Sequence, residues 1–156
     1  MKTTETLVRP VHTFTITKPR NDWEKAQYKI FRYNTTLLYY VSLIHPTTGR
    51  TAYKVGITTK GIGGRFEKEE AMGYTIKVLD TAWFFNGWEA YNAEQSLLSY
   101  YTSHRPYDNT HNSYLAGTGN SEVFSEDVLN GQLPLLKLTK SRKSTSIVTQ
   151  QPKETI

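Results

Sequence analysis

The segment TLLYYVSLI (36–44), followed by HPTTGR (45–50) and TAYKVGIT (51–58), decides the fold of this chain. Both outer segments are rich in β-branched, aromatic and aliphatic residues, which fit the pleated surface of a strand. The segment between them contains Pro and Gly, which interrupt regular structure and favour a turn. The sequence therefore predicts a β-hairpin over residues 36–58.

The pattern continues on both sides of this hairpin. Apolar periodicity and glycine or proline breaks predict two further strands and three helices, with short elements near 122–129 and 133–138. The strands are expected at 12–17 and 74–85, and the helices at 22–30, 61–73 and 88–102. This order predicts a small mixed α/β (α+β) domain with a three-stranded, mainly antiparallel sheet flanked by helices.

Composition divides the chain into three parts. We expect a basic N-terminal extension over 1–35, a folded domain over 36–138 and a flexible basic tail over 139–156, which is rich in Ser, Thr, Lys and Gln. There is no cysteine, so disulfides, thiolate zinc sites and cysteine nucleophiles are excluded. Without a signal peptide or a long apolar run, the chain is expected to be soluble and cytoplasmic, in a bacterial host if it is phage-encoded.

The charge is unevenly distributed along the sequence. Residues 1–60 hold ten Lys and Arg against three acids, residues 61–136 hold four against ten, and residues 137–156 hold five against one. Basic flanks suit a polyphosphate partner, although an ordinary solvated surface explains the net charge of +5 equally well. The basic residues expected to contact a nucleic-acid backbone are Lys18, Arg20, Lys25, Lys29, Arg32 and Lys60, and from the tail Lys137, Lys140, Arg142 and Lys143.

One residue departs from the pattern of its helix. In WEAYNAEQSLLSYY (88–101), one helical face carries five apolar or aromatic residues with Glu94 in their midst. A buried carboxylate is costly unless it meets a cation, a metal or a proton. Glu94 could thus form a structural salt bridge, or it could bind Mg²⁺ or act as an acid or base. The four histidines lack metal-ligand spacing, which disfavours zinc.

Four short motifs together resemble the GIY-YIG nuclease family. Leu38-Tyr39-Tyr40-Val41 resembles the GIY strand, and Tyr53-Lys54-Val55-Gly56 resembles the YIG strand of members with Lys-Ile/Val-Gly. Arg65 lies near the family's arginine, and Glu94 lies on a later helix like the family's metal-binding glutamate. EQSLLSYYTSHRPYDN (94–109) and GTGNSEVF (117–124) are similar to later family motifs, so the resemblance covers about residues 36–127.

The resemblance implies a metal-dependent endonuclease that hydrolyses phosphodiester bonds. Glu94 would hold one Mg²⁺ (or Mn²⁺), and Tyr39 would take a proton from the attacking water. Arg65 suits the phosphate oxygens because its guanidinium is planar and forked. Lys54 would favour the phenolate of Tyr39 from the neighbouring strand. Asn109 would orient the site, with Asn112 and Asn120 as alternatives.

Double-stranded DNA is the favoured substrate, no membrane partner is expected, and cleavage of both strands could use a homo-oligomer. The sequence departs from the family at Leu37 in place of glycine, at Lys54 in place of tyrosine, and at Glu69 in place of histidine or tyrosine. A catalytically inactive module that binds nucleic acid or a protein is therefore an alternative. A tyrosine-rich assembly protein is another.

Overall fold

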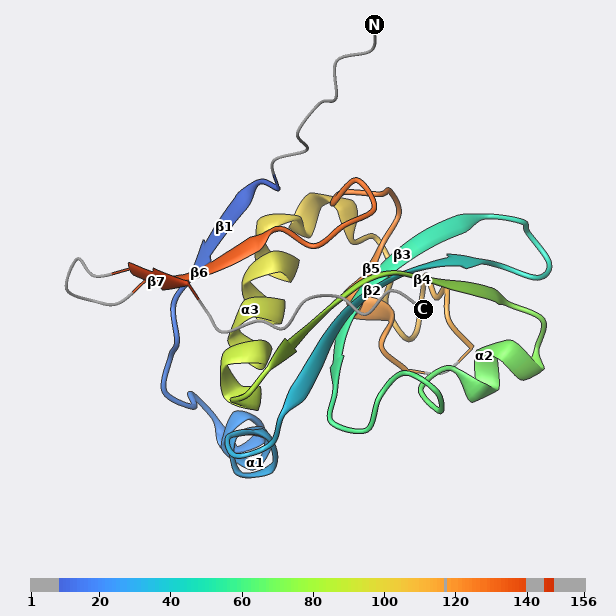
Figure 1. The fold of residues 1–156 in the computed structure, drawn as a ribbon. Coiled ribbons are helices and arrows are strands. Elements are labelled where there is room, and N and C mark those ends of the chain that lie inside the picture. The colour runs from blue at the N-terminus through green and yellow to red at the C-terminus, as the bar shows by residue number, and fades with distance from the viewer. Residues whose placement is uncertain (1–8, 117, 140–144, 148–156) are drawn as a thin grey trace, which may run out of the picture.

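The computed structural model describes residues 9–116, 118–139 and 145–147, and it forms a small mixed α/β domain (Figure 1). A four-stranded antiparallel sheet has the order β4-β2-β3-β5, and β1 pairs in parallel with β6 in a second sheet, which β7 extends. The strands are β1 (Val11–Phe14), β2 (Thr36–Ile44), β3 (Thr51–Thr58), β4 (Thr75–Phe84), β5 (Val123–Phe124), β6 (Leu135–Thr139) and β7 (Thr145–Ile147). The α-helices are α1 (Asp22–Phe31), α2 (Glu67–Ala71) and α3 (Gly87–Tyr100), and the 3-10 turns are Thr102–His104 and Asn120–Glu122.

The hairpin of β2 and β3 is confirmed at the expected residues, and it forms the middle of the larger sheet. Both faces of β2 are buried over residues 36–41, which explains why its sequence is an almost continuous apolar run. The sheet has four strands instead of the expected three, because the two-residue strand β5 pairs with the outer side of β3. Such a short strand carries too little sequence pattern to be predicted alone.

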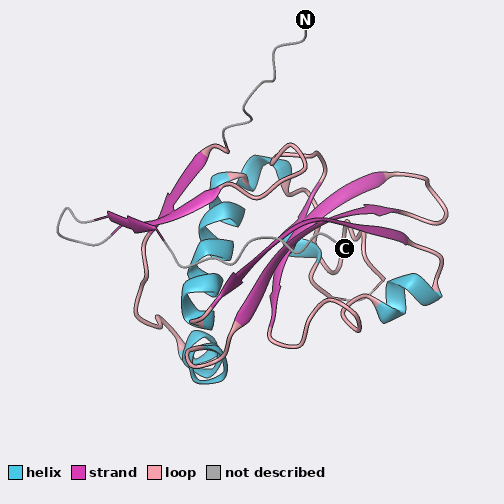
Figure 2. Ribbon diagram, viewed as in Figure 1, coloured by secondary structure: helices cyan, strands magenta, loops and turns pink. Residues whose placement is uncertain are grey.

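Helix α3 lies between the two sheets, as the ribbon views show (Figures 1 and 2). On that side, Leu38 and Tyr40 of β2 share one apolar cluster with Leu97 of α3 and with Phe14 and Leu136 of the second sheet. The opposite face of β2 packs in a separate cluster beneath the loop that follows α3. Members of the second cluster include Tyr39, Val41, Leu43, Phe66, Tyr114, Leu115 and Val123.

The described part of the N-terminal segment packs against the rest of the domain. Pairing of β1 with β6 joins it to the C-terminal part of the chain, and α1 lies across the beginning of α3. Asn21 caps α1 by accepting a 2.8 Å hydrogen bond from the backbone nitrogen of Glu24. Most of the expected tail, including Lys140, Arg142 and Lys143, falls outside the described residues, and Lys137 is half-buried in β6.

The helix expected over 61–73 is much shorter. Helix α2 begins only at Glu67, and residues 62–66 form turns, so Arg65 precedes the helix instead of lying on it. The glycines at 61, 63 and 64 account for this difference because glycine disfavours helix, and Gly61 has a φ of +87°. No helix among the described residues is long and apolar enough to span a membrane.

The contact between α1, β2 and α3 leaves no room for a side chain at Gly87. A Cβ there would lie 2.4 Å from the carbonyl oxygen of Phe31 and 2.4 Å from Oγ1 of Thr36. We expect Gly87→Ala to lower the free energy of unfolding by about 1–3 kcal/mol through overpacking. Urea unfolding checks this, with Gly63→Ala as the control because nothing lies within 4 Å of that position. Equal stability of the two variants would contradict the prediction.

Candidate functional site

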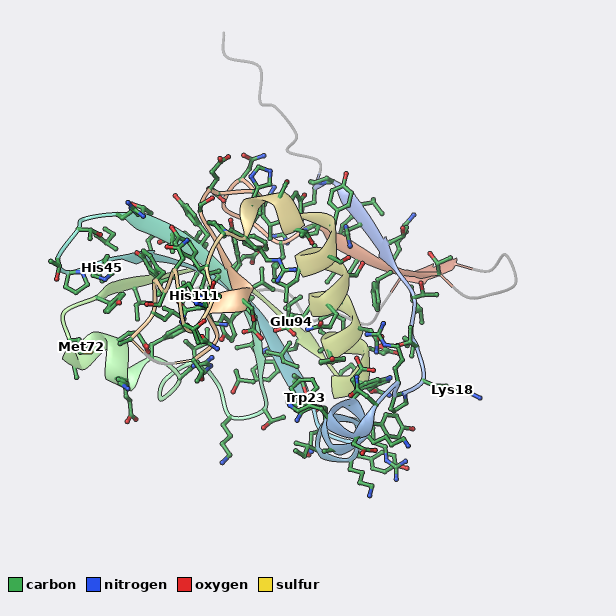
Figure 3. The ribbon with its side chains drawn as sticks, turned by 180° about the vertical axis from the view of Figure 1, so that it is seen from behind. Lys18, Trp23, His45, Met72, Glu94 and His111 are labelled. Atoms are coloured by element: carbon green, nitrogen blue, oxygen red, sulfur yellow. The ribbon has the colours of Figure 1, made fainter. Side chains whose placement is uncertain are left out.

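A cavity of about 180 Å³ brings together three of the residues that the sequence singled out. Tyr39 comes from β2, Arg65 from the turn before α2, and Glu94 from the middle of α3. Figure 3 labels Glu94 on α3 and, nearer the N-terminal end of that helix, Trp23 on α1. The remaining lining residues are Trp23, Gln27, Phe31, Ile57, Tyr91, Gln95 and Glu122.

Tyr39 reaches this cavity by crossing the neighbouring strand over a glycine. Tyr39 is directly opposite Gly56 in the ladder, and a Cβ at Gly56 would lie 2.2 Å from the Tyr39 hydroxyl oxygen. Any larger residue at position 56 would therefore displace the ring. Phe66 holds the ring from the side, edge to face, with centroids 5.9 Å apart.

The hydroxyl of Tyr39 is buried and makes no hydrogen bond within the described structure. Burial raises the pKa of Tyr39, and this effect outweighs the nearby positive charges of Lys54 and Arg65, which lower it. The expectation that Lys54 favours the phenolate therefore has the correct sign. It is nevertheless too weak by itself, so the phenol is neutral at physiological pH. A buried hydroxyl without a partner can form a hydrogen bond with a ligand or a water molecule that enters the cavity.

Glu94 is buried, as its place on an apolar helix face predicted, with 3% of its surface exposed. The amide of Gln95 donates a 3.0 Å hydrogen bond to its Oε1. Burial, and then the negative charge of Glu122, raise the pKa of Glu94 to about 8. Lys54 and Arg65 act in the opposite direction but do not compensate. The carboxyl thus holds a proton at neutral pH unless further positive charge enters the cavity.

Glu122 is a site residue that was not among the predicted ones. Its carboxylate pairs with the ammonium group of Lys54, which is completely buried beneath the cavity. The pairing of β3 with β5 brings them together, because Lys54 is opposite Val123, the residue that follows Glu122. Burial lowers the pKa of Lys54. The opposite effect of Tyr39, Glu122 and Glu94 is larger, so the pKa is raised overall and the lysine stays charged. The glutamate of the segment GTGNSEVF was the sequence signal that could have identified Glu122.

Arg65 presents its guanidinium to the cavity without an ion pair. It makes a cation–π contact with Phe66, in which its central carbon lies 5.4 Å from the ring centroid, and no hydrogen bond with another described side chain. The loop before Glu122 covers the guanidinium at Gly119, where a Cβ would lie 3.2 Å from a terminal nitrogen of Arg65. Gly119 has a φ of +93°, so glycine suits this position for both its conformation and its size. The half-buried, unpaired guanidinium is suited to an anion.

Asn109, expected to orient the site, lies outside the cavity and acts on the loop that carries Glu122. Its side-chain oxygen accepts a 2.9 Å hydrogen bond from the amide of Asn120. Asn120 is buried and accepts hydrogen bonds from the backbone nitrogens of Tyr114 and Leu115. Asn109 and Asn120 together therefore fix the approach of the chain to Glu122. Asn112 instead donates to the carbonyl oxygen of Pro106.

The donors around the cavity fit one hard divalent cation. Glu94 and Glu122 supply carboxylate oxygens, and no group of three or more His, Cys, Asp or Glu side chains in the described parts of the chain could hold a metal. Magnesium usually takes one or two carboxylates and keeps several waters, so two carboxylates suffice. A cation would also favour the ionised form of Glu94, whose pKa is raised first by burial and then by the negative charge of Glu122.

The expected nucleic-acid contacts on α1 are only partly available. Lys25 and Lys29 are exposed, but helical geometry places them on the side of α1 opposite Trp23 and Gln27, which line the cavity. The guanidinium of Arg32 lies over the rings of neighbouring tyrosines. These residues could bind backbone phosphates only at a distance from the cavity.

The other expected basic contacts differ among themselves. Arg20 forms a salt bridge with Glu24, to which its terminal nitrogen donates a hydrogen bond of 2.8 Å. Hydrogen bonds from Arg20, and one of 2.9 Å from the Tyr91 hydroxyl, help to lower the pKa of Glu24 to about 2. Lys18 and Lys60 are exposed, and Lys60 follows the cavity residue Ile57 by three positions. Neither Lys18 nor Lys60 lines the cavity.

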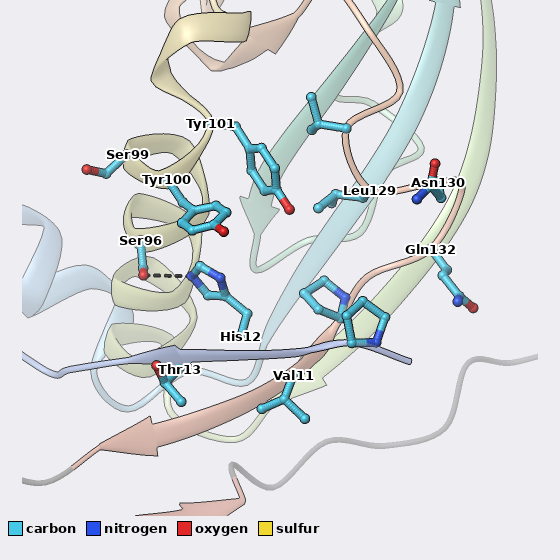
Figure 4. Close-up of a pocket in the computed structure, with 13 residues that line it drawn as sticks. Val11, His12, Thr13, Ser96, Ser99, Tyr100, Tyr101, Leu129, Asn130 and Gln132 are labelled. Carbon is cyan, nitrogen blue, oxygen red and sulfur yellow. Dashed lines mark hydrogen bonds between the residues drawn. The ribbon is translucent and has the colours of Figure 1, made fainter. Parts of the chain in front are cut away.

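A larger cavity of about 580 Å³ lies on another side of α3, next to β1 (Figure 4). There, the Nε2 of His12 and the Oγ of Ser96 are 2.8 Å apart, and the aromatic side chains of Tyr100 and Tyr101 point into the same space. Burial lowers the pKa of His12, so the imidazole is neutral. None of the residues predicted for the site lines this cavity, and none of its lining residues is charged.

No protein-family model, curated protein or solved structure matches the chain significantly. The geometry and chemistry of the cavity that holds Tyr39, Arg65 and Glu94 are therefore the features that point to a function.

The raised pKa of Glu94 predicts a distinct pH dependence of stability. The folded protein keeps this proton up to about pH 8, whereas an ordinary glutamate loses it near 4.5. The protein therefore has its full stability below the pKa that Glu94 has in the unfolded state. This stability is lost as the pH rises from there through the higher pKa that Glu94 has in the folded state. In urea unfolding without divalent cations, wild type should lose stability relative to Glu94→Gln between about pH 5 and pH 8.

The effect of Mg²⁺ on stability provides a second comparison of wild type with Glu94→Gln. At pH 8 the ion should raise the unfolding midpoint of wild type and leave that of Glu94→Gln unchanged, because a ligand of the native state stabilises it. Parallel pH curves together with no effect of Mg²⁺ would contradict the assignment of Glu94.

Proposed function

We propose that this protein is a divalent-cation-dependent endonuclease of the GIY-YIG type that hydrolyses phosphodiester bonds in DNA. The observation that carries the proposal is the convergence of Tyr39, Arg65 and Glu94 on one cavity, from segments far apart in the sequence. Glu94 was predicted from its place on an apolar helix face, and Tyr39 and Arg65 from the resemblance to the family. A GIY-YIG-like fold is part of the proposal and agrees with the antiparallel hairpin and the position of α3 beside it.

Arg65 would bind the scissile phosphate. Its guanidinium can donate two parallel hydrogen bonds to the non-bridging oxygens, and no described carboxylate lies within salt-bridge distance of it. The backbone at Gly119 limits how far the guanidinium can move. This restriction holds the phosphate in a fixed position above Tyr39 and Glu94, which is the main contribution of the protein in phosphoryl chemistry.

Glu94 and Glu122 would hold the cation, which supplies positive charge to the phosphate and to the leaving oxygen. Glu94 must release its proton for this, and its pKa of about 8 makes that release accessible near neutral pH. Lys54 pairs with the carboxylate of Glu122 and holds it at the cavity edge. Lys54 thereby acts as a positioning residue for a carboxylate, in addition to its expected effect on the phenolate of Tyr39.

Tyr39 would orient the attacking water through its unpartnered hydroxyl. In the cation-free protein the proton stays on the hydroxyl oxygen, because burial raises the pKa. The positive charges of Lys54 and Arg65 reduce the cost of forming phenolate, and Tyr39 accepts the proton of the water only in that form. Activity is therefore expected to rise with pH.

Cleavage of plasmid DNA in Mg²⁺ or Mn²⁺ tests the proposal directly. Arg65→Ala and Glu94→Ala should each lower the rate by about a hundredfold or more, because each removes a group that binds the phosphate or the cation. Glu67→Ala and Lys68→Ala are matched controls, since both residues are exposed on α2 and neither lines the cavity. If the four variants cleave as wild type does, the catalytic assignment is wrong.

Tyr39→Phe separates catalysis from packing. The ring contact with Phe66 is kept and only a hydroxyl without a partner is lost, so stability should change by no more than about 0.5 kcal/mol. The cleavage rate should nevertheless fall by about a hundredfold. Rates and urea midpoints measured on the same preparation check both statements. A full-rate variant would remove Tyr39 from the mechanism.

A second candidate is a DNA-binding module with the same cavity and no hydrolysis. The neutral states of Tyr39 and Glu94 at pH 7 favour it, because neither group is ready as a base without additional positive charge. Arg65-dependent DNA binding without any cleavage, at pH values up to 9 and with either metal, would select this candidate.

A further inference from the structure

The cavity has an aromatic wall whose position within the site the sequence did not predict. Trp23 of α1 lines it together with Arg65 and Glu94, and Figure 3 labels Trp23 near the N-terminal end of α3. Its side chain is 60% exposed. Tryptophan is usually well buried, so an exposed indole next to a concave polar site has a surface available for a ligand.

The position of this indole is fixed before any ligand arrives. One side contacts the ring of Tyr91, with centroids 6.0 Å apart, and Tyr91 in turn stacks on Trp88 at 4.7 Å. The adjacent Glu24 is buried, paired with Arg20 and hydrogen-bonded to the Tyr91 hydroxyl. The first turn of α1 is therefore anchored on α3, which reduces the entropy lost when something stacks on Trp23.

Gln27 lies one turn after Trp23 on the same side of α1 and lines the same cavity. Its side chain is half-buried, and its amide makes no hydrogen bond with any described residue. An amide provides one acceptor and two donors, which is the pattern that pairs with the edge of a nucleobase. A flat apolar surface and a free amide thus occur together beside the phosphate-binding arginine.

We propose that Trp23 and Gln27 hold the nucleobase next to the scissile phosphate, with Trp23 stacking on its face and Gln27 pairing with its edge. The inference rests on the proposed function. It names the substrate class as DNA with an unstacked base at the cleavage position, because a base inside an intact duplex has no free face. The N-terminal segment that carries α1 therefore selects the substrate.

Binding of fluorescent duplexes in EDTA tests this without cleavage. One duplex carries a single unpaired nucleotide, and the other carries an abasic residue at the same position. Wild type should bind the first about tenfold more tightly, the expected contribution of one stacked base. Trp23→Ala should bind both equally, at the wild-type affinity for the abasic duplex. Gln27→Ala should keep the preference for a base and lose discrimination among the four bases.

Tyr33→Ala is the matched control, because Tyr33 is an exposed aromatic residue just after α1 that does not line the cavity. It should retain the full preference. If Trp23→Ala keeps the preference while wild type still cleaves plasmid, stacking is wrong and the nuclease proposal stands. Equal loss of both affinities with a lowered urea midpoint would assign Trp23 a structural role and overturn the inference. Absence of DNA binding by wild type overturns both proposals.

Discussion

The burial of two ionisable side chains, Lys54 and Glu94, in one place is the constraint on which the site depends. Lys54 is completely buried, Glu94 nearly so, and the partly exposed Glu122 joins them from the 3-10 turn just before β5. Isolated charges would be very costly there, so each must be paired or protonated. Lys54 and Glu122 satisfy each other, whereas Glu94 keeps a proton. Because Glu122 is paired and Glu94 is protonated, Glu94 is the carboxyl that can exchange its proton for a cation.

Two glycines give this charged cluster its shape. Gly56 lets the ring of Tyr39 cross β3 and enter the cavity from the opposite face of the sheet. Gly119 lets the loop before Glu122 lie close to Arg65. Both positions exclude a side chain because functional groups occupy the space, which links local backbone chemistry to the arrangement of the site.

The segment before the hairpin contributes to the site as well as to the fold. Its strand β1 completes the second sheet, and its helix α1 supplies the aromatic wall beside Arg65 and Glu94. The basic side chains of α1 were expected to contact the nucleic-acid backbone. Lys25 and Lys29 instead face away from the cavity, and the apolar and amide side chains of the same helix face toward it.

The sequence by itself determined β2, β3 and α3, and it identified Glu94 as a buried carboxylate, because these features follow from periodic patterns within short segments. Only the tertiary structure decided that Arg65 shares a cavity with Glu94, that Glu122 meets Lys54, and that Trp23 lines the cavity. Lys54 and Glu122 are 68 positions apart, joined by a two-residue strand without a pattern of its own. Such contacts depend on how distant segments pack, and a local pattern carries no information about that packing.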